Sequence, residues 1–121
     1  MSGGELGTVY HDGETIVRQG EPGTCMYVVQ EGQVEVSVTK GDGEVRLALL
    51  GAGDVFGEMA LFSKDARSAT VRALRDARVL RVDKQTFLRR VHEDPSLAFR
   101  LLQKMAERIR ALDQRLVRGA D

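Results

Sequence analysis

The sequence has few of the features that would tie the chain to an oxidising compartment, a membrane or a nucleic acid. Cys25 is the only cysteine among the 121 residues, so no internal disulfide can form, and a reducing compartment is favoured. No apolar run approaches the roughly 20 residues of a membrane-spanning helix, and the first residues do not resemble a signal peptide. The 18 basic and 18 acidic residues balance, so the chain has little general attraction for nucleic acid. We therefore expect a cytoplasmic protein without a membrane span.

The sequence also lacks the residue groupings of common catalytic and metal centres. Its two histidines, His11 and His92, are far apart in the chain, whereas metal-binding β-barrels of similar topology use a His-x-His pair with further histidines. Cys25 has no evident partner, and no nucleophile lies beside a candidate base. We therefore expect no enzyme activity, no metal and no cofactor.

A β-rich region is predicted for residues 9–83, after a short N-terminal tail (residues 1–8). Short apolar stretches are separated by glycine-rich turns, and Val34, Val36 and Val38 alternate with Glu35 and Ser37. Such alternation is typical of a half-buried antiparallel sheet. The pattern predicts an antiparallel β-roll of the jelly-roll type, in a protein that is mainly β with some α. Its expected strands cover residues 15–18, 26–29, 34–38, 45–50, 69–73 and 78–82.

A helical region is predicted for residues 84–118. Asp83 is placed to cap a helix over about 84–92, and Asp94 with Pro95 opens a second helix that runs to about 117. Apolar residues recur along this second helix in steps of four and three: Ala98, Leu102, Met105, Ile109, Leu112 and Leu116. Such a seam favours a parallel homodimer, while the simpler interpretation is that the seam covers the β-roll.

Residues 56–70 combine features that suit a ligand with a sugar hydroxyl and a phosphate. Gly57 follows Phe56 where a strand must turn sharply into a helix, and glycine allows the positive φ such a turn requires. The expected short helix 58–61 presents backbone N–H groups at its start, where an anion is favoured. An ordinary turn glycine is the plainer interpretation of Gly57 alone.

Two charged residues in this stretch have distinct chemistry. The Glu58 carboxylate can accept a hydrogen bond from a sugar hydroxyl, although helix dipoles also favour glutamate in a first turn. The planar guanidinium of Arg67 can bind two phosphate oxygens, as lysine cannot. The plainer interpretation is a surface arginine paired with Asp65.

This stretch resembles the phosphate-binding cassette of cyclic-nucleotide-binding domains, and the resemblance extends over about residues 9–116. It implies that the Glu58 carboxylate accepts a hydrogen bond from the ribose 2′-OH and that Arg67 binds the exocyclic oxygens of the cyclic phosphate. Many members have proline before this arginine, where this chain has Ala66. Members also usually have a helical segment before the first strand, where this chain has only about eight residues, as in a shortened version of the domain.

The resemblance implies a set of ligand-binding residues in the cassette and the last helix. Backbone groups of Gly57 and Ala60 are expected to border the phosphate and ribose, and Ser68 to reach a phosphate oxygen or the base. Candidate walls of the pocket are Val28, Val34, Leu47, Leu49 and Val71, for which core packing is the plainer interpretation. The full predicted set is Phe56, Gly57, Glu58, Met59, Ala60, Arg67, Ser68, Ala69, Arg108, Leu112 and Asp113.

The identity of the base depends on Ser68 and on the last helix, which in the family closes over the base as a lid. Ser68 favours cAMP, because bacterial gene activators that use cAMP also have serine at the corresponding position. Asp113, however, can accept two hydrogen bonds from guanine N1 and N2, which favours cGMP. The plainer interpretation of Asp113 is a solvated residue on an exposed helix face.

The resemblance therefore predicts a cAMP-sensing module, of the type found in catabolite gene activators and protein kinase A regulatory subunits. Binding is expected to be transmitted through the C-terminal helix to a homodimer partner or an attached effector domain. The helix-turn-helix that follows this helix in gene activators is not in these residues, so no DNA binding is expected of the chain by itself. The alternatives are a cGMP-selective sensor and a degenerate dimerisation domain that binds no nucleotide.

Overall fold

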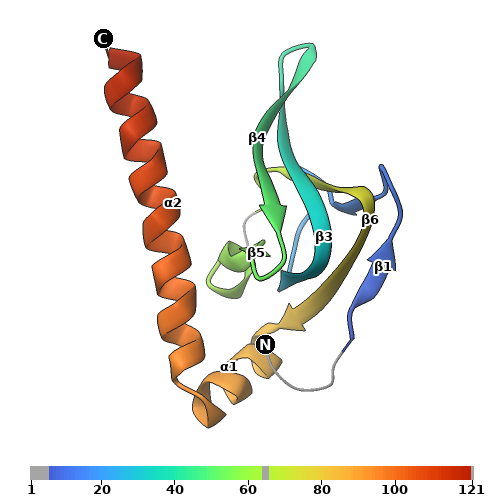
Figure 1. Cartoon of the computed structure of the whole chain (residues 1–121), viewed down its shortest axis with the longest axis vertical. Coiled ribbons are helices and arrows are strands. Elements are labelled where there is room, and N and C mark those ends of the chain that lie inside the picture. The colour runs from blue at the N-terminus through green and yellow to red at the C-terminus, as the bar shows by residue number, and fades with distance from the viewer. Residues whose placement is uncertain (1–5, 64–65, 121) are drawn as a thin grey trace. The chain divides into compact units, whose positions relative to one another are not determined.

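The computed structural model describes residues 6–63 and 66–120, except for the side chains of Leu112 and residues 115–120. The chain forms two compact units, Met1–Thr86 and Phe87–Asp121. The first holds the strands and the second holds most of the helical residues (Figure 1).

A single antiparallel sheet forms the first unit. Its strand order is β1-β6-β3-β4, with β2 paired to β6 and β5 paired to β3. Figure 1 shows β3 and β4 as a long hairpin and β6 running beside β3. The predicted fold class, an antiparallel β-roll with C-terminal helices, is confirmed. The strands are β1 (Thr8–Tyr10), β2 (Thr15–Val17), β3 (Cys25–Lys40), β4 (Gly43–Gly51), β5 (Val55–Phe56) and β6 (Thr70–Asp83).

The glycine-rich turn expected between strands 26–29 and 34–38 is wrong, because β3 continues through residues 31–33 as one strand. The register against β6 shifts on either side of Glu31, and Gly32 has a φ of 81°. A Cβ on Gly32 would lie 2.4 Å from the carbonyl oxygen of Asp76 on β6. Gly32 therefore supports a β-bulge where two strands approach closely. Glycine is favoured in such a bulge as it is in a turn, so the sequence alone does not distinguish the two.

The predicted break between strands 69–73 and 78–82 is also absent, since β6 continues through both segments. Arg75 has a φ of 56°, and among the described residues no other non-glycine residue has a positive φ. Its backbone N–H donates a hydrogen bond to Asp12 Oδ1 at 2.6 Å. The strand is thus locally distorted at Arg75 while its pairing with β3 resumes beyond it.

The apolar core of this unit is formed mainly by side chains of the neighbouring strands β3 and β6. Val29 and Val34 are fully buried, and Phe56 from β5 is 4% exposed. The expected burial pattern fails at Ser37, which is 2% exposed although it was predicted on the solvent face. The buried Ser37 hydroxyl donates to Glu44 Oε1 at 2.6 Å, which satisfies the hydroxyl.

Both predicted helices and their caps are confirmed. α1 covers Lys84–Glu93, and Asp83 Oδ1 accepts a hydrogen bond from the Thr86 N–H at 2.8 Å. α2 covers Ser96–Ala120, and Asp94 Oδ1 accepts from the Ser96 N–H and hydroxyl at 3.1 and 2.6 Å. These bonds to Ser96 lower the pKa of the Asp94 carboxyl. In the described part of the chain, no helix is long and apolar enough to cross a membrane.

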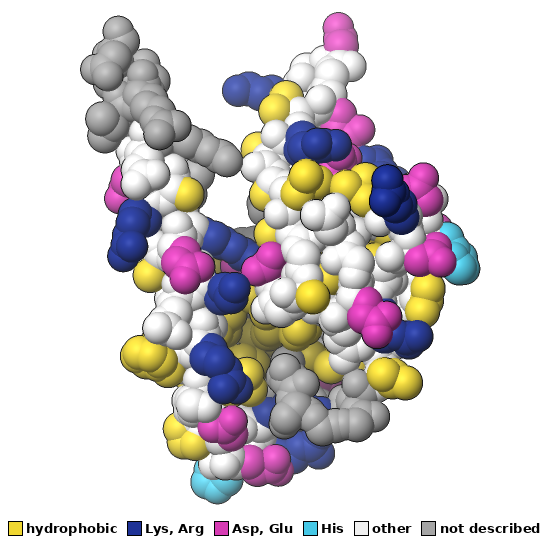
Figure 2. Space-filling model, viewed as in Figure 1, with side chains coloured by type: hydrophobic (Ala, Val, Ile, Leu, Met, Phe, Trp, Pro, Cys, Tyr) yellow, Lys and Arg dark blue, Asp and Glu magenta, His cyan; other side chains and the backbone are white. Residues whose placement is uncertain are grey.

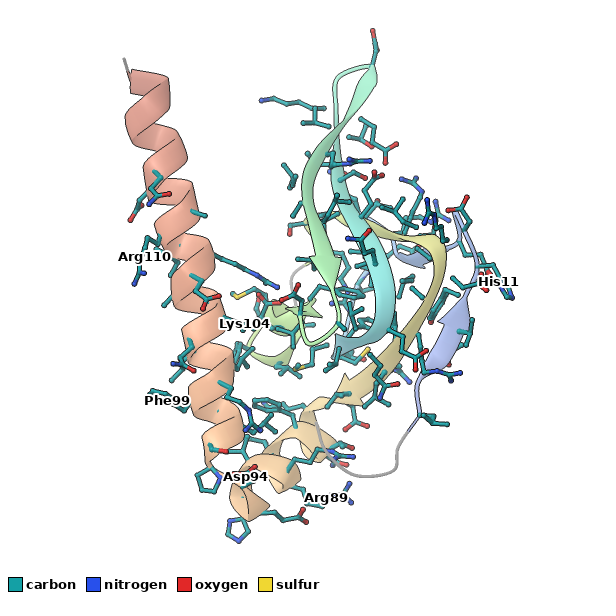
Figure 3. All side chains as sticks on the ribbon, in the orientation of Figure 1. His11, Arg89, Asp94, Phe99, Lys104 and Arg110 are labelled. Carbon is teal, nitrogen blue, oxygen red and sulfur yellow. The ribbon has the colours of Figure 1, made fainter. Side chains whose placement is uncertain are left out.

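The exposed apolar face of α2 differs in part from the predicted seam. Phe99, Leu102 and Ile109 are about 60% exposed, and Figure 3 shows Phe99 projecting from the helix. Ala98 and Met105 are only half-buried, while the side chains of Leu112 and Leu116 lie outside the described residues. We refer to Phe99, Leu102 and Ile109 as the α2 apolar stripe.

Candidate functional site

The site is built on a sharp turn between β5 and the 3₁₀ helix η1 (Glu58–Leu61). Gly57 has φ 73° and ψ 15°, the left-handed conformation that glycine adopts without penalty. Its carbonyl accepts the Ala60 N–H at 3.1 Å, which closes the turn. A Cβ at this position would lie 2.6 Å from Arg67 Nη1. Gly57 is therefore required both by its φ and by the close approach of the arginine.

The residues around Gly57 have different exposures, which separate structural roles from contact roles. Phe56 is buried, and its ring stacks on Tyr27 with centroids 5.1 Å apart and planes 11° apart. Met59 is 59% exposed and Ala60 is half-buried. Phe56 thus anchors the turn in the core, whereas Met59 and Ala60 lie at the surface.

Glu58 is an acidic side chain in a buried position. This residue is 9% exposed. Among the described residues, Ser37 and Thr70 are the only other buried polar residues. Burying a carboxylate costs free energy unless polar groups compensate it. A buried acid is uncommon in proteins, so Glu58 at the first position of η1 is a candidate functional residue.

The main chain of Arg67 is fixed by the loop between β2 and β3. Its N–H donates to the Glu21 carbonyl at 2.8 Å, and its carbonyl accepts the Gly20 N–H at 2.8 Å. The preceding residue, Ala66, forms a β-bridge with Pro22. Ala66 and Arg67 thus form a segment that is paired with the β2–β3 loop.

The guanidinium of Arg67 points at the Gly57 turn. Nη2 donates to the Cys25 carbonyl at 2.8 Å, and Nη1 donates to the Gly57 carbonyl at 3.1 Å. Its Cζ lies 5.8 Å from the ring centroid of Tyr27. A guanidinium has five N–H donors, so these contacts are compatible with additional bonds to an anion. The structure thus brings Arg67 and Gly57 together, while Asp65 lies outside the described residues.

The residues after Arg67 lead into β6. Ser68 is exposed, Ala69 is half-buried and Thr70 is buried as the first residue of the strand. The Thr70 hydroxyl accepts the Gln19 N–H at 2.9 Å, so Thr70 has a structural role in holding the β2–β3 loop. Ser68 is thus accessible to a ligand.

The candidate pocket walls divide into two groups. Val28, Val34 and Val71 are buried, as core packing explains. Leu47 and Leu49 are 41% and 45% exposed on β4, where yellow apolar side chains are visible at the surface in Figure 2. Core packing does not explain these two leucines, which stay candidates for ligand or partner contact.

Three residues next to Arg67 are not identified by the sequence pattern. A Cβ on Gly23 would lie 2.0 Å from Arg67 Nε, so only glycine leaves room for the arginine. Cys25 is buried, and its sulfur accepts from Arg81 Nε at 3.1 Å, so the cysteine has the partner that the sequence does not reveal. Burial, and then hydrogen bonding with Cys25, raises the pKa of Tyr27 to about 12. The only sequence signal for these contacts is Gly23 in the β2–β3 loop.

The remaining predicted site residues, Arg108, Leu112 and Asp113, lie in α2. Arg108 is half-buried, Asp113 is exposed, and the side chain of Leu112 lies outside the described residues. They belong to the second compact unit, so their contact with a ligand stays a prediction.

The chain belongs to the cyclic nucleotide-binding domain family, since the family model for this domain matches residues 8–94. It is 36% identical to the cyclic AMP receptor protein of Thermus thermophilus over 109 residues, which are 89% of this chain and 50% of that protein. The crystal structure of the Thermus thermophilus catabolite activator protein superimposes with a TM-score of 0.80 and 35% identity, over 90% of this chain and 52% of that one.

A second group of solved structures contains bound cyclic nucleotides. The EAL enzyme Bd1971 in its cAMP-bound form has a TM-score of 0.65 and 40% identity, over 88% of this chain and 29% of that one. Its cGMP-bound form has a TM-score of 0.66 and 37% identity over the same shares. The chain spans about half the length of the Thermus relative and less of Bd1971.

Proposed function

We propose that this domain binds a 3′,5′-cyclic nucleotide, with cAMP as the first ligand and cGMP as the alternative, and catalyses no reaction on it. The observation that carries the proposal is the Arg67 guanidinium held against the Gly57 turn. Membership of the family supports it, as do the cAMP-bound and cGMP-bound neighbours.

In the proposed complex, sugar and phosphate are recognised by separate residues. Arg67 binds the exocyclic oxygens of the cyclic phosphate through two N–H groups, and the Gly57 turn allows the phosphate to approach the backbone. The Glu58 carboxylate, buried at the start of η1, accepts a hydrogen bond from the ribose 2′-OH. Ser68 and Asp113, both exposed, are the residues we assign to discrimination of the base.

Signal output is proposed to run through α2. Arg108, Leu112 and Asp113 act as a lid on the base, and binding shifts the population between open and closed positions of the helix. The α2 apolar stripe supports association with a second copy of the chain or with an attached effector domain, since exposed apolar side chains at helical spacing favour helix–helix contact. A single cysteine is typical of proteins in a reducing compartment, and the domain is therefore proposed to work in the cytoplasm.

The role of Glu58 gives an experiment that tests this function. The native chain is expected to bind cAMP about 10- to 150-fold more tightly than 2′-deoxy-cAMP, because removing the hydroxyl takes away a hydrogen bond to a charged group of about 1.5–3 kcal/mol. Glu58→Gln is expected to weaken cAMP binding and to reduce this discrimination to a few-fold. Competition binding of the two nucleotides provides the measurement.

Glu31→Gln is the matched control, because Glu31 lies on β3 with 76% of its side chain exposed. It should leave both affinities unchanged. Equal affinity of the native chain for cAMP and 2′-deoxy-cAMP would contradict the assignment of Glu58.

A further inference from the structure

We propose that Tyr27 is a positioning residue, which sets the orientation of the Arg67 guanidinium before the nucleotide arrives. The inference rests on the proposed cyclic-nucleotide function and assigns a residue outside the 56–70 cassette to its phosphate site. Tyr27 lies on β3, where its backbone pairs with Phe56 on β5 and with Arg81 on β6.

The aromatic face beneath the arginine is rigidly supported. The Tyr27 ring is stacked on the buried Phe56 ring, and the Arg67 Cζ lies 5.8 Å from the Tyr27 centroid. This distance is within the range in which an aromatic face attracts a guanidinium. Phe56 immediately precedes Gly57, so one stacked pair connects the support of the arginine to the turn that the arginine contacts.

The backbone restricts the guanidinium further. A Cβ on Gly23 would lie 2.0 Å from Nε and 2.2 Å from Cζ, so the Gly23 backbone is packed directly against the side chain. The carbonyls of Cys25 and Gly57 each accept one of its terminal N–H groups. With Tyr27, these contacts restrict both the plane and the rotation of the guanidinium.

The tyrosine acts here as a neutral ring. Its pKa of about 12 keeps the hydroxyl protonated at physiological pH, so attraction to Arg67 comes from the ring face. A cation that is already oriented loses less freedom when it binds a phosphate, and this preorganisation increases affinity. Removing the ring is therefore expected to weaken nucleotide binding without removing any ligand contact.

The test is a double-mutant cycle measured by calorimetric titration of the full chain with cAMP and cGMP. Tyr27→Leu is expected to raise Kd about 5- to 30-fold, whereas Tyr27→Phe, which keeps the ring, stays within about 2-fold. In the Arg67→Ala background, Tyr27→Leu is expected to have no further effect, because the group it positions is gone. Tyr10→Leu is the control, since Tyr10 also packs against the core cluster.

A second measurement reports on the arginine in the ligand-free protein. The Arg67 Nε–H signal in a ¹⁵N NMR spectrum, assigned by its loss in Arg67→Ala, should keep its position in Tyr27→Phe and move in Tyr27→Leu. Thermal unfolding of each variant confirms that it is folded.

The outcomes separate this inference from the proposed function. Equal losses from Tyr27→Leu with and without Arg67, or an unmoved Nε–H signal, would overturn the positioning role while leaving nucleotide binding intact. If the native chain bound neither cyclic nucleotide, the proposed function would fail and the phosphate-site role of Tyr27 with it, whatever the NMR signal showed about the ring contact.

Discussion

Arg67→Ala is expected to weaken cyclic-nucleotide binding by about 2–5 kcal/mol, or roughly 30- to 5,000-fold in Kd. The loss is large because a phosphate charge in the site would be left without its paired cation. Arg67→Lys should recover only part of this affinity, because an ammonium group has no planar fork to bind two oxygens. Calorimetric titration of the native chain and both variants measures the effect.

Arg67 also holds the carbonyls of Cys25 and Gly57, so its variants must be compared in stability as well as affinity. Denaturant unfolding of Arg67→Ala separates the two contributions. Arg18→Ala is the control, since Arg18 is exposed and pairs only at the surface with Glu21, three residues further along the chain. Unchanged affinity in Arg67→Ala, with the fold intact, would remove Arg67 from the site.

Phe56→Ala is expected to lower the free energy of unfolding by about 3–5 kcal/mol. The ring is 4% exposed, belongs to the main core cluster and stacks on Tyr27, so its removal leaves a cavity directly beneath the Gly57 turn. Small domains are stable by only about 5–15 kcal/mol, and such a loss is therefore a large fraction of the total. Urea unfolding at fixed pH provides the measurement.

Phe62→Ala is the matched control for this substitution. Phe62 follows η1 and is 65% exposed, so its truncation should change stability by no more than about 0.5 kcal/mol. Similar losses from both substitutions would show that Phe56 does not anchor the turn.

β2, β3, β4 and β6 were predictable from alternation, but β1 and the continuity of β3 and β6 were not. Gly32 gives the same local signal in a turn and in a β-bulge, and only the approach of Asp76 from β6 selects the bulge. Arg75 carries no turn-forming signal that would mark its positive φ, which is supported by the distant Asp12. In both places a long-range contact decides the local backbone.

The candidate site shows the same division. Gly57, Glu58 and Arg67 are close in the sequence, and their types, spacing and resemblance to the family cassette predict a phosphate-binding turn before any fold is known. Gly23 and Tyr27 become part of that site only when the β2–β3 loop pairs with residues 66 and 67. Their contacts therefore depend on folding of the whole unit.

The helix seam was predicted from spacing alone, and exposure changes part of it. Leu102 and Ile109 are exposed, as a partner contact would require, whereas Met105 is half-buried. Phe99, which is not part of the predicted seam, is exposed as well. Periodicity identifies an apolar face on a helix, but it does not say which of its residues the fold already covers.

Calorimetric titration of the full chain with cAMP, cGMP and 5′-AMP tests the central claim most directly. We expect saturable binding of at least one cyclic nucleotide at a single site per chain, and much weaker binding of 5′-AMP, whose phosphate is not closed onto the ribose. Absence of saturable binding by both cyclic nucleotides at millimolar concentration would contradict the proposed function.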